Sequence, residues 1–281
     1  MKFLAILLGV IFLLTPGTTT KAEEEVKINL SNKEKVVALL TSIETGDPKP
    51  ISYINPDKYI QHNLIVSDGL TGFGEVIKQL PEGSAKARVV RAFQDGNYVF
   101  THTEYNFFGP KIGFDIFRFE DGMIVEHWDN LQEIATESAS DRTQIDGPTA
   151  ATDFDKTLAN KALVKGFVRD VLMGTNPGKI TEYISTEQYL QHNPAVADGL
   201  EALGKALEAM AKAGTPMVYT ENHMILGEGN FVLTVSEGQF LGKHVALYDL
   251  FRIENEKIVE HWDTIEEILP KDKWMNNNEK F

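Results

Sequence analysis

The chain has 281 residues, of which 42% are hydrophobic, enough for two domains of about 130 residues that each bury a core. It carries 27 Lys and Arg against 41 Asp and Glu, a net charge of −14. Such a surface repels phosphate backbones and anionic lipid, so no nucleic-acid or membrane partner is expected. The absence of cysteine excludes disulfides, thiolate metal ligands and cysteine nucleophiles.

The N-terminus has the pattern of a removable export signal. Lys2 precedes an unbroken apolar run over residues 3–14, and a small polar stretch ends at Ala22. The run is about half of the ~20 residues that a membrane-spanning helix needs. We therefore expect residues 1–22 to be a signal peptide and the mature protein to be exported, either periplasmic or secreted. An uncleaved anchor is the alternative.

Helices precede strands in the next part of the chain. Apolar residues have helical spacing over 35–45 and again over 72–80, with a short segment, Tyr59 to Asn63, between them. Alternating patterns then predict four strands, at 88–93, 98–105, 113–119 and 123–129. Asp-Gly pairs mark two of the turns. Helices grouped before an antiparallel sheet indicate an α+β fold.

The same sequence pattern occurs twice in the chain. YIQHN at 59–63 returns as YLQHN at 189–193, and DIFRFEDGMIVEHWD at 115–129 returns as DLFRIENEKIVEHWD at 249–263, with 10 of 15 positions identical. Helical spacing also recurs, over 158–173 and 200–213. A polar stretch without periodicity, 138–153, separates the copies. We expect a tandem duplication with domains at 23–147 and 148–281.

The turn between the last two strands decides which side chains share a face, because a one-residue slip moves every side chain to the other face. If the loop has two residues, Asp115 lies with Trp128. If the loop has three residues and a bulge at Gly122, Asp115 lies with His127 and Asp129. The residues alone leave both registers open.

Charge pairing favours the bulged loop, because it places Arg118 and Glu126 diagonally on the opposite face. The second copy has Asn255 and Glu256 at the turn, which weakens the inference there. A glutamate in a left-handed conformation would cost on the order of 1 kcal/mol.

The YIQHN segment, the following Asp-Gly pair and the DIFRFEDGMIVEHWD pattern resemble the SnoaL-like group of the nuclear transport factor 2 superfamily. That superfamily includes ketosteroid isomerase and limonene epoxide hydrolase. The resemblance covers nearly all of both halves. It implies two cone-shaped domains, each with helices packed on a curved antiparallel sheet around a pocket. It also implies aldol-type cyclisation that needs no cofactor.

The resemblance implies a set of pocket residues in each half. By this alignment the hydrogen-bond donors are Asp115 and Asp249, in the place of an isomerase aspartic acid, and the bases are His62 and His192. The last strands would add His127, Asp129, His261 and Asp263 as polar positioning groups. Phe117 and Phe251 would form apolar walls, and Tyr59 and Tyr189 are candidate ligand contacts.

The departures from the family are informative. The isomerase base is an aspartate, here replaced by histidine, and the Asp-Arg-Asp set of the epoxide hydrolases has no counterpart. Steroid isomerisation and epoxide hydrolysis are therefore not carried over. Removing a proton beside a carbonyl needs a base near neutral pKa and a donor for the enolate oxygen, and histidine with a neutral carboxylic acid fits both roles.

Plainer interpretations compete with each of these roles. His127 could be held between carboxylates in a packing network, and His62 could bond backbone groups at the end of a helix. Two histidines and a carboxylate could also hold a metal, but their spacing matches no metal motif, so no metal is expected.

Two functional hypotheses follow. In the first, each half binds a small apolar carbonyl compound and catalyses a cofactor-free cyclase or isomerase reaction. In the second, the protein binds a ligand without turnover, or its halves pack as an intramolecular pseudo-dimer that presents an interaction surface.

Overall fold

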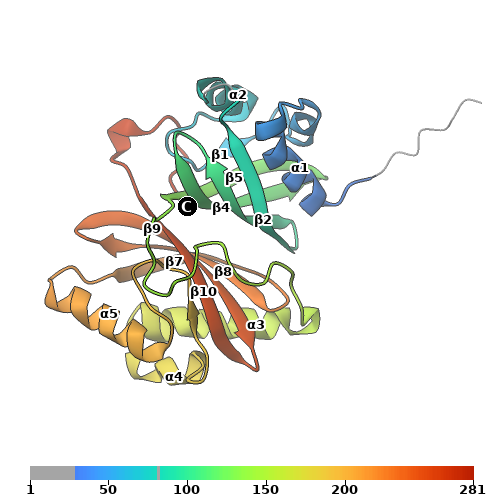
Figure 1. The fold of residues 1–281 in the computed structure, drawn as a ribbon. Coiled ribbons are helices and arrows are strands. Elements are labelled where there is room, and N and C mark those ends of the chain that lie inside the picture. The colour runs from blue at the N-terminus through green and yellow to red at the C-terminus, as the bar shows by residue number, and fades with distance from the viewer. Residues whose placement is uncertain (1–28, 81–82) are drawn as a thin grey trace, which may run out of the picture.

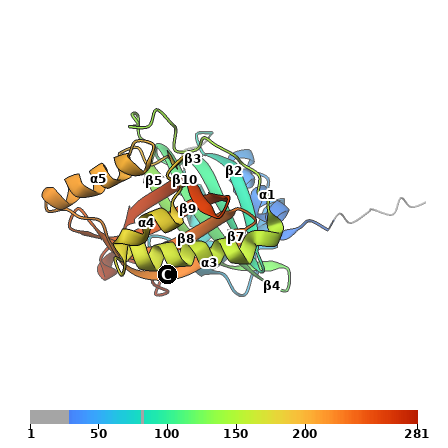
Figure 2. The same cartoon turned by 90° about the horizontal axis from the view of Figure 1, so that it is seen from below.

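The computed structural model describes residues 29–80 and 83–281, so the expected signal peptide lies outside the described residues. Two five-stranded sheets lie face to face at the centre of the molecule, and helices cover their outer sides (Figure 1). Seen from below, α3, α4 and α5 lie across the outer side of the second sheet (Figure 2). The expected α+β class is confirmed, with one mixed sheet in each half.

The first half follows the predicted order of helices and then strands. Its elements are α1 (Asn32–Thr45), η1 (Lys49–Tyr53), β1 (Ile60–Gln61), α2 (Gly69–Gln79), β2 (Lys86–Asp95), β3 (Tyr98–Asn106), β4 (Pro110–Glu120) and β5 (Met123–Glu133). The strand order is β1-β5-β4-β3-β2, and β1 pairs with β5 in parallel. This short first strand was not predicted, because two residues show no periodicity.

The second half repeats this arrangement with the order β6-β10-β9-β8-β7. Its elements are η2 (Phe154–Lys156), α3 (Thr157–Phe167), the π-helical η3 (Val168–Leu172), η4 (Pro177–Lys179), α4 (Ile180–Tyr183), β6 (Leu190–Gln191), α5 (Leu200–Lys212), β7 (Val218–Glu228), β8 (Phe231–Phe240), β9 (Lys243–Glu254), β10 (Lys257–Glu267) and η5 (Lys271–Lys273). The predicted helix at 158–173 is thus continued by a π-helical turn.

Local sequence explains where α1 begins and ends. Ser31 and Glu34 form a capping box, in which each side chain accepts from the backbone N–H of the other residue. Gly46 ends the helix with φ 71°, a left-handed conformation that suits glycine. Between these caps, Val36, Leu39 and other apolar residues point onto the concave face of the first sheet. The helix therefore forms one wall of the cavity described below.

Alternation along the strands gives each sheet two buried faces. On β4, Phe114 and Ile116 point toward the other half, whereas Phe117 points toward the helices. The core between the sheets is shared by both halves and includes Trp128 and Trp262. Burying a large apolar side chain is worth about 1.5–3 kcal/mol, so this shared core strongly favours the paired arrangement.

The expected three-residue loop is wrong. Glu120 pairs directly with Met123, and Asp121 and Gly122 form a two-residue turn with φ of 47° and 77°. The bulge lies one step further on, at Val125, where the register shifts. Because of this bulge, Asp115, His127 and Asp129 lie on one face, as we expected. The residues of the turn do not by themselves predict where the bulge lies.

The segments that follow the sheets cross to the opposite half. The first tail, residues 138–148, lies on the second half, and the second tail, residues 274–281, lies on the first half (Figure 1). The N–H of Ala139 donates to the carbonyl of Pro194, and the N–H of Met275 donates to the equivalent carbonyl, that of Leu64. The halves thus exchange tails by matched contacts. The domain boundary near residue 148 stays a prediction.

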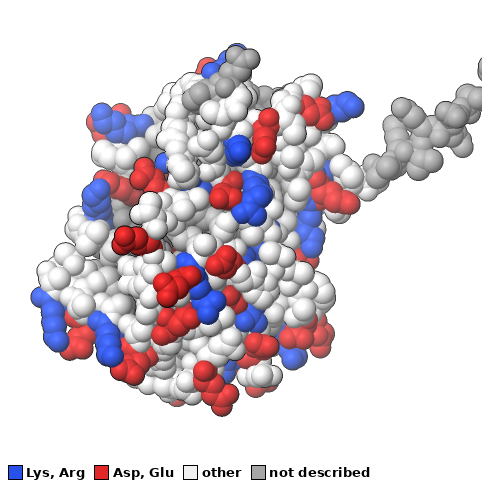
Figure 3. All heavy atoms as spheres, in the orientation of Figure 1, with Lys and Arg blue, Asp and Glu red and all other residues white. Residues whose placement is uncertain are grey.

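Acidic and basic side chains are interspersed on the face seen in Figure 3. Among residues 29–80 and 83–281, no helix combines the length and the apolarity that crossing a membrane requires.

Candidate functional site

Because side chains alternate along an extended segment, every second side chain of YIQHN points toward a cavity between the first sheet and its helices. Tyr59, Gln61 and Asn63 line this cavity, whereas Ile60 and His62 point to the other face. Asp68 fixes the segment by accepting from the N–H of Gln61 at 2.9 Å. The cavity wall is therefore set by β1 and its pairing with β5.

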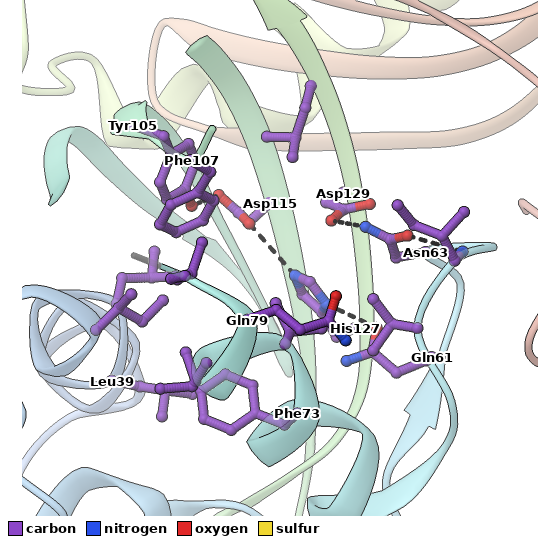
Figure 4. Close-up of a pocket in the computed structure, with 18 of the residues that line it drawn as sticks. Leu39, Gln61, Asn63, Phe73, Gln79, Tyr105, Phe107, Asp115, His127 and Asp129 are labelled. Carbon is purple, nitrogen blue, oxygen red and sulfur yellow. Dashed lines mark hydrogen bonds and ion pairs between the residues drawn. The ribbon is translucent and has the colours of Figure 1, made fainter. Parts of the chain in front are cut away.

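The floor of the cavity is made by β4 and β5 (Figure 4). Asp115 lies opposite Asp129 in the register, and Phe117 lies opposite His127. The Phe117 ring stacks on the His127 imidazole with the centroids 4.5 Å apart. Two carboxyl groups and one imidazole consequently converge on one apolar cavity, and all three belong to buried or nearly buried side chains.

His127 connects the two walls. Its Nδ1 lies 3.0 Å from Gln61 Oε1, and its Nε2 lies 3.3 Å from Asp115 Oδ1. An amide oxygen accepts only, so Nδ1 carries a hydrogen. His127 Nε2 and Asp115 Oδ1 face each other, so the contact between them joins β5 to β4.

Hydroxyl groups hold the second oxygen of Asp115. Tyr105 Oη donates to Oδ2 at 2.5 Å and Thr101 Oγ1 donates at 3.2 Å. Burial raises the pKa of Tyr105 well above its usual value, and the negative charge of Asp115 raises it further. The phenol therefore stays protonated and serves as a fixed hydrogen-bond donor.

Asp129 is held differently from Asp115. Asn63 Nδ2 donates to Asp129 Oδ2 at 2.6 Å, and Asn63 Oδ1 accepts from the N–H of Ile65. The amide is thus oriented by its own backbone. Burial, followed by the charges of Asp129 and Asp115, raises the pKa of Tyr59, the nearby cavity tyrosine.

The cavity is small and mainly apolar. Its volume is about 230 Å³, below the roughly 300–1,000 Å³ that is usual for ligand pockets, so a small molecule is the fitting ligand. Its apolar walls come from α1, from α2 with the residue that follows it, and from the turn between β3 and β4. They include Leu39, Leu40, Ile43, Phe73, Val76, Ile77, Leu80, Phe107 and Phe108.

The second half contains an equivalent cavity of about 240 Å³. His261 Nδ1 lies 3.0 Å from Gln191 Oε1, and its Nε2 lies 3.0 Å from Asp249 Oδ1. Asn193 donates to Asp263 Oδ2 at 2.7 Å. The expected residues Tyr189 and Phe251 also line this cavity. The two polar floors therefore repeat almost contact for contact.

Buried charges shift the pKa values in the second cavity. Burial lowers the pKa of His261, but the hydrogen bond to Asp249 and the charges of Asp263 and Asp249 outweigh it, so the pKa is raised. Burial raises the pKa of Asp263, opposed by His261 and Asn193 and supported by Asp249. Each group therefore releases its proton at a higher pH than its ordinary pKa would give.

Comparison with known proteins gives structural matches only. No family model and no curated protein sequence matches the chain. TsrD from Streptomyces laurentii is 24% identical over 38% of this chain and 89% of its own, with a TM-score of 0.31. IdmH from Streptomyces antibioticus is 18% identical, covering 38% of this chain and 91% of its own (TM-score 0.31). An LEH-like epoxide hydrolase from M. tuberculosis is 15% identical, covering 40% and 85% (TM-score 0.31).

At these identities the likeness to the three structures concerns the fold alone, and each match covers 38–40% of this chain. A fold of this kind hosts many chemistries, so function is argued below from the cavity residues.

His62 and His192 do not lie where the alignment with isomerases placed them. His62 stacks on Trp128 with centroids 4.5 Å apart, on the face opposite the cavity, and its Nε2 lies 3.0 Å from Glu126 Oε1. Its Nδ1 donates to the carbonyl of Glu279 in the second tail. His192 makes the same contacts with Trp262, Glu260 and the carbonyl of Thr143 in the first tail. These histidines anchor the exchanged tails, so the base assigned to them is corrected.

Several cavity residues were missed by the sequence interpretation. They are Gln61, Asn63, Gln191, Asn193, Tyr105 and Tyr219. The amides could have been found by applying strand alternation to YIQHN, because they flank the histidine on both sides. The tyrosines could not be found by comparing the copies, because Tyr105 and Tyr219 lie on different strands.

Two groups of side chains among the described residues have donor atoms close enough to hold a metal ion. Asp249, His261 and Asp263 in the second cavity have ligand atoms within 4.8 Å of one another, as have Glu221, His223 and Glu237 on the surface. The expectation that no metal and no cofactor is needed stays a prediction.

Proposed function

We propose that the protein is exported, binds a small, largely apolar carbonyl compound in the cavity of each half, and catalyses cofactor-free proton transfer of the cyclase or isomerase type. The observation that carries this proposal is the convergence of Asp115, His127 and Asp129 at the floor of an apolar-walled cavity. Carboxyl and imidazole groups at the end of an apolar cavity are the combination that enolisation requires.

The base in this scheme is Asp129, in place of the histidine that the alignment assigned. Its carboxylate removes a proton from the carbon beside the ligand carbonyl, so a C–H bond breaks and an O–H bond forms on Asp129. The electron pair moves to the carbonyl oxygen. A proton carried by the Asp115–His127 pair then stabilises that enolate oxygen by a hydrogen bond.

The enolate has two possible outcomes. Return of the proton from Asp129 to a different carbon is an isomerisation. Attack of the enolate carbon on a second carbonyl of the same molecule is an aldol ring closure, in which the new alkoxide takes up the proton. Both outcomes regenerate Asp129 as a carboxylate. General acid–base catalysis of this kind typically contributes about 10²–10⁴-fold in rate.

Hydrogen exchange tests the proposal directly. In D₂O, the protein should accelerate deuterium incorporation beside the carbonyl of small cyclic and open-chain diketones. The paired substitutions Asp129→Asn and Asp263→Asn should lower that rate by about 10²-fold or more. The matched control is Asp155→Asn, an exposed carboxylate outside both cavities. If the parent protein incorporates deuterium no faster than buffer alone while it still binds ligand, the catalytic proposal is wrong.

Ligand binding without turnover is the second candidate function. It is favoured by the position of His62 and His192, because each cavity then contains only one imidazole. Native mass spectrometry of gently purified protein would show a retained compound in this case. Its loss from Phe117→Trp and Phe251→Trp variants, in which a larger ring fills the cavity, would place it there.

Export is supported by the sequence of residues 1–22 alone. The intact mass of the protein recovered from the periplasm or the medium tests it. A mature chain that begins after Ala22 is expected, and a full-length chain retained in the membrane fraction would contradict the proposal.

A further inference from the structure

Two glutamates and two histidines form a cluster near the turn between β8 and β9, outside both cavities. We call it the edge cluster, and it consists of Glu221 and His223 on β7, Glu237 on β8 and His244 on β9. None of the four lines either cavity. Glu237 shares a face with Val235, so the cluster lies on the side of the second sheet that also forms the core between the halves. Its side chains take no part in the chemistry proposed above.

The carboxylate of Glu237 lies at the centre of the edge cluster. His223 Nε2 lies 3.1 Å from Glu237 Oε2, and His244 Nε2 lies 2.6 Å from Glu237 Oε1. Ligand atoms of Glu221, His223 and Glu237 all lie within 4.8 Å of one another. The ring of Phe281 stacks on the His223 imidazole with the centroids 4.0 Å apart, so the orientation of this imidazole is fixed.

The two carboxylates of the edge cluster repel each other. Glu221 lies directly opposite Glu237 in the pairing of β7 with β8, and like charges in such a cross-strand pair destabilise a sheet. Within residues 29–80 and 83–281, the side chain of Glu221 makes no hydrogen bond or ion pair. This exposed side chain is therefore free to turn toward a cation that it shares with Glu237.

The first half has an ordinary ion pair at the equivalent place. Arg88 lies opposite Glu104 in the register of β2 with β3, and its Nη2 lies 2.7 Å from Glu104 Oε2. In each half the strand bulges two residues after this pair, at Val90 in the first half and at His223 in the second. The two bulged residues consequently correspond, and only the second copy has a metal ligand there.

The fourth member of the edge cluster is also specific to the second half. The alignment that brings Asp115 onto Asp249 brings Pro110 onto His244. The second copy thus has a glutamate in place of an arginine, and histidines in place of a valine and a proline, around a glutamate that both copies have. These three differences remove an ion pair and together supply imidazole and carboxylate ligands for a divalent transition metal.

We propose that the edge cluster binds one zinc ion. Zinc binds imidazole nitrogen and carboxylate oxygen at about 2.0–2.2 Å in a tetrahedral arrangement, which places neighbouring ligand atoms about 3.4 Å apart. The 3.1 Å between His223 Nε2 and Glu237 Oε2 is already close to this spacing. Two carboxylates and two neutral imidazoles also balance the charge of a divalent ion.

Zinc at this place stabilises the edge of the second sheet. It joins β7, the edge strand, to β8 and β9, and it replaces the repulsion between Glu221 and Glu237 by attraction to a shared cation. Through His223 the site also contacts Phe281 in the second tail. The expectation that the cavities need no metal is not affected.

Zinc titration tests the proposal. Isothermal titration calorimetry of the full chain, purified without a histidine tag and treated with a chelator, should detect zinc binding, and added zinc should raise the melting temperature. His223→Gln and His244→Gln should each weaken binding by about 100-fold or more, the upper end of what the loss of an outer-shell partner costs. Their side chains are 23% and 44% exposed, so both variants should fold.

Glu221→Arg is the matched variant, because it restores the ion pair that Arg88 forms with Glu104. It should fold and lose zinc binding, since an opposite charge then faces Glu237. Asp263→Asn, which removes a member of the other possible metal group, should bind zinc as the parent does.

Three results would each overturn the proposal. They are a parent protein that binds no zinc, zinc binding that survives Glu221→Arg, and zinc binding that is lost in Asp263→Asn, which would place the ion in the second cavity. Because no turnover is measured, each result is independent of the proposed catalytic function.

Discussion

Tyr105 and Tyr219 bind equivalent carboxylates from different strands of the duplicated sheet. Tyr105 on β3 donates to Asp115 at 2.5 Å, and Tyr219 on β7 donates to Asp249 at 3.1 Å. The register places Ala87 opposite Tyr105 in the first half and Tyr219 opposite Gly238 in the second. The large and small members of this cross-strand pair have thus changed places, while the hydroxyl reaches the same carboxyl.

Removing either hydroxyl should destabilise the protein, because a buried carboxyl loses a donor. Tyr105→Phe and Tyr219→Phe should each lower the free energy of unfolding by about 1–3 kcal/mol, as measured by urea denaturation. Tyr98→Phe, at the partly buried edge of the shared core, is the control. The prediction fails if both cavity variants unfold at the same urea concentration as the control.

The tyrosine exchange shows what comparison of the copies could and could not reveal. A repeat search finds residues that stay at one position, such as Asp115 and Asp249, and it located both cavity floors correctly. It cannot find a function that moves between neighbouring strands. Opposite Tyr219 lies Gly238, where a Cβ would lie 2.2 Å from the carbonyl oxygen of Val218. This close contact is visible only in the structure. The glycine therefore has a steric reason that the sequence does not display.

The histidines show a second limit. The resemblance assigns His62 the role of a base, but the adjacent strand β1, Ile60–Gln61, has only two residues, too few to show a period of two. Its parallel pairing with β5 fixed the face, and that pairing is a long-range contact. Residue chemistry suggested a role, whereas the face depended on a contact between residues far apart in sequence.

His62 and His192 should contribute to tail docking rather than to proton removal. His62→Ala should speed hydrogen exchange of the second-tail amide of Met275, which donates to Leu64, and leave the first tail unchanged. His192→Ala should do the reverse, with faster exchange at Ala139. Each variant is thereby the control for the other, and amide exchange followed by mass spectrometry resolves the two tails.

A catalytic role for His62 would give a different result. If His62→Ala abolished deuterium incorporation into a diketone while the tail amides stayed protected, the histidine would have a chemical role that its position does not explain. The expected loss of stability is about 1–3 kcal/mol, because the imidazole satisfies a buried carboxylate and a backbone carbonyl.

The turn between β9 and β10 holds two residues other than glycine in the left-handed conformation. Asn255 and Glu256 have φ of 49° and 61°, where the first half has Asp121 and Gly122. A two-residue hairpin turn of this kind favours Asn-Gly or Asp-Gly. Glu256→Gly should therefore raise the free energy of unfolding by up to about 1 kcal/mol, since glycine adopts the left-handed region without steric cost.

The reciprocal substitution tests the same argument. Gly122→Glu should lower the free energy of unfolding by a similar amount. A Cβ at Gly122 would meet only the Lys35 Nζ, at 3.7 Å, so backbone strain rather than a clash should dominate. Thermal or urea unfolding measures both changes. A destabilised Glu256→Gly variant would contradict the strain that the backbone angles indicate.

Asp263 should make the stability of the protein depend on pH. Its pKa is raised in the folded state, by burial first and by Asp249, so the native state binds its proton more tightly than the unfolded chain does. The stabilisation is present in full below the unfolded pKa of about 3.8. It is lost as the pH rises through the folded value. The raised pKa of His261 contributes with the same sign at higher pH.

The slope separates this effect from general acid unfolding. Between the two pKa values of Asp263, the group should lower the free energy of unfolding by at most about 1.4 kcal/mol per pH unit. Asp263→Asn mimics the neutral acid and should flatten the dependence, also because His261 loses one of the charges that raise its pKa. Asp155→Asn should keep the parent slope. Urea unfolding at a series of pH values measures the three slopes, and equal slopes in all of them would show that Asp263 ionises in the folded protein as freely as in the unfolded chain.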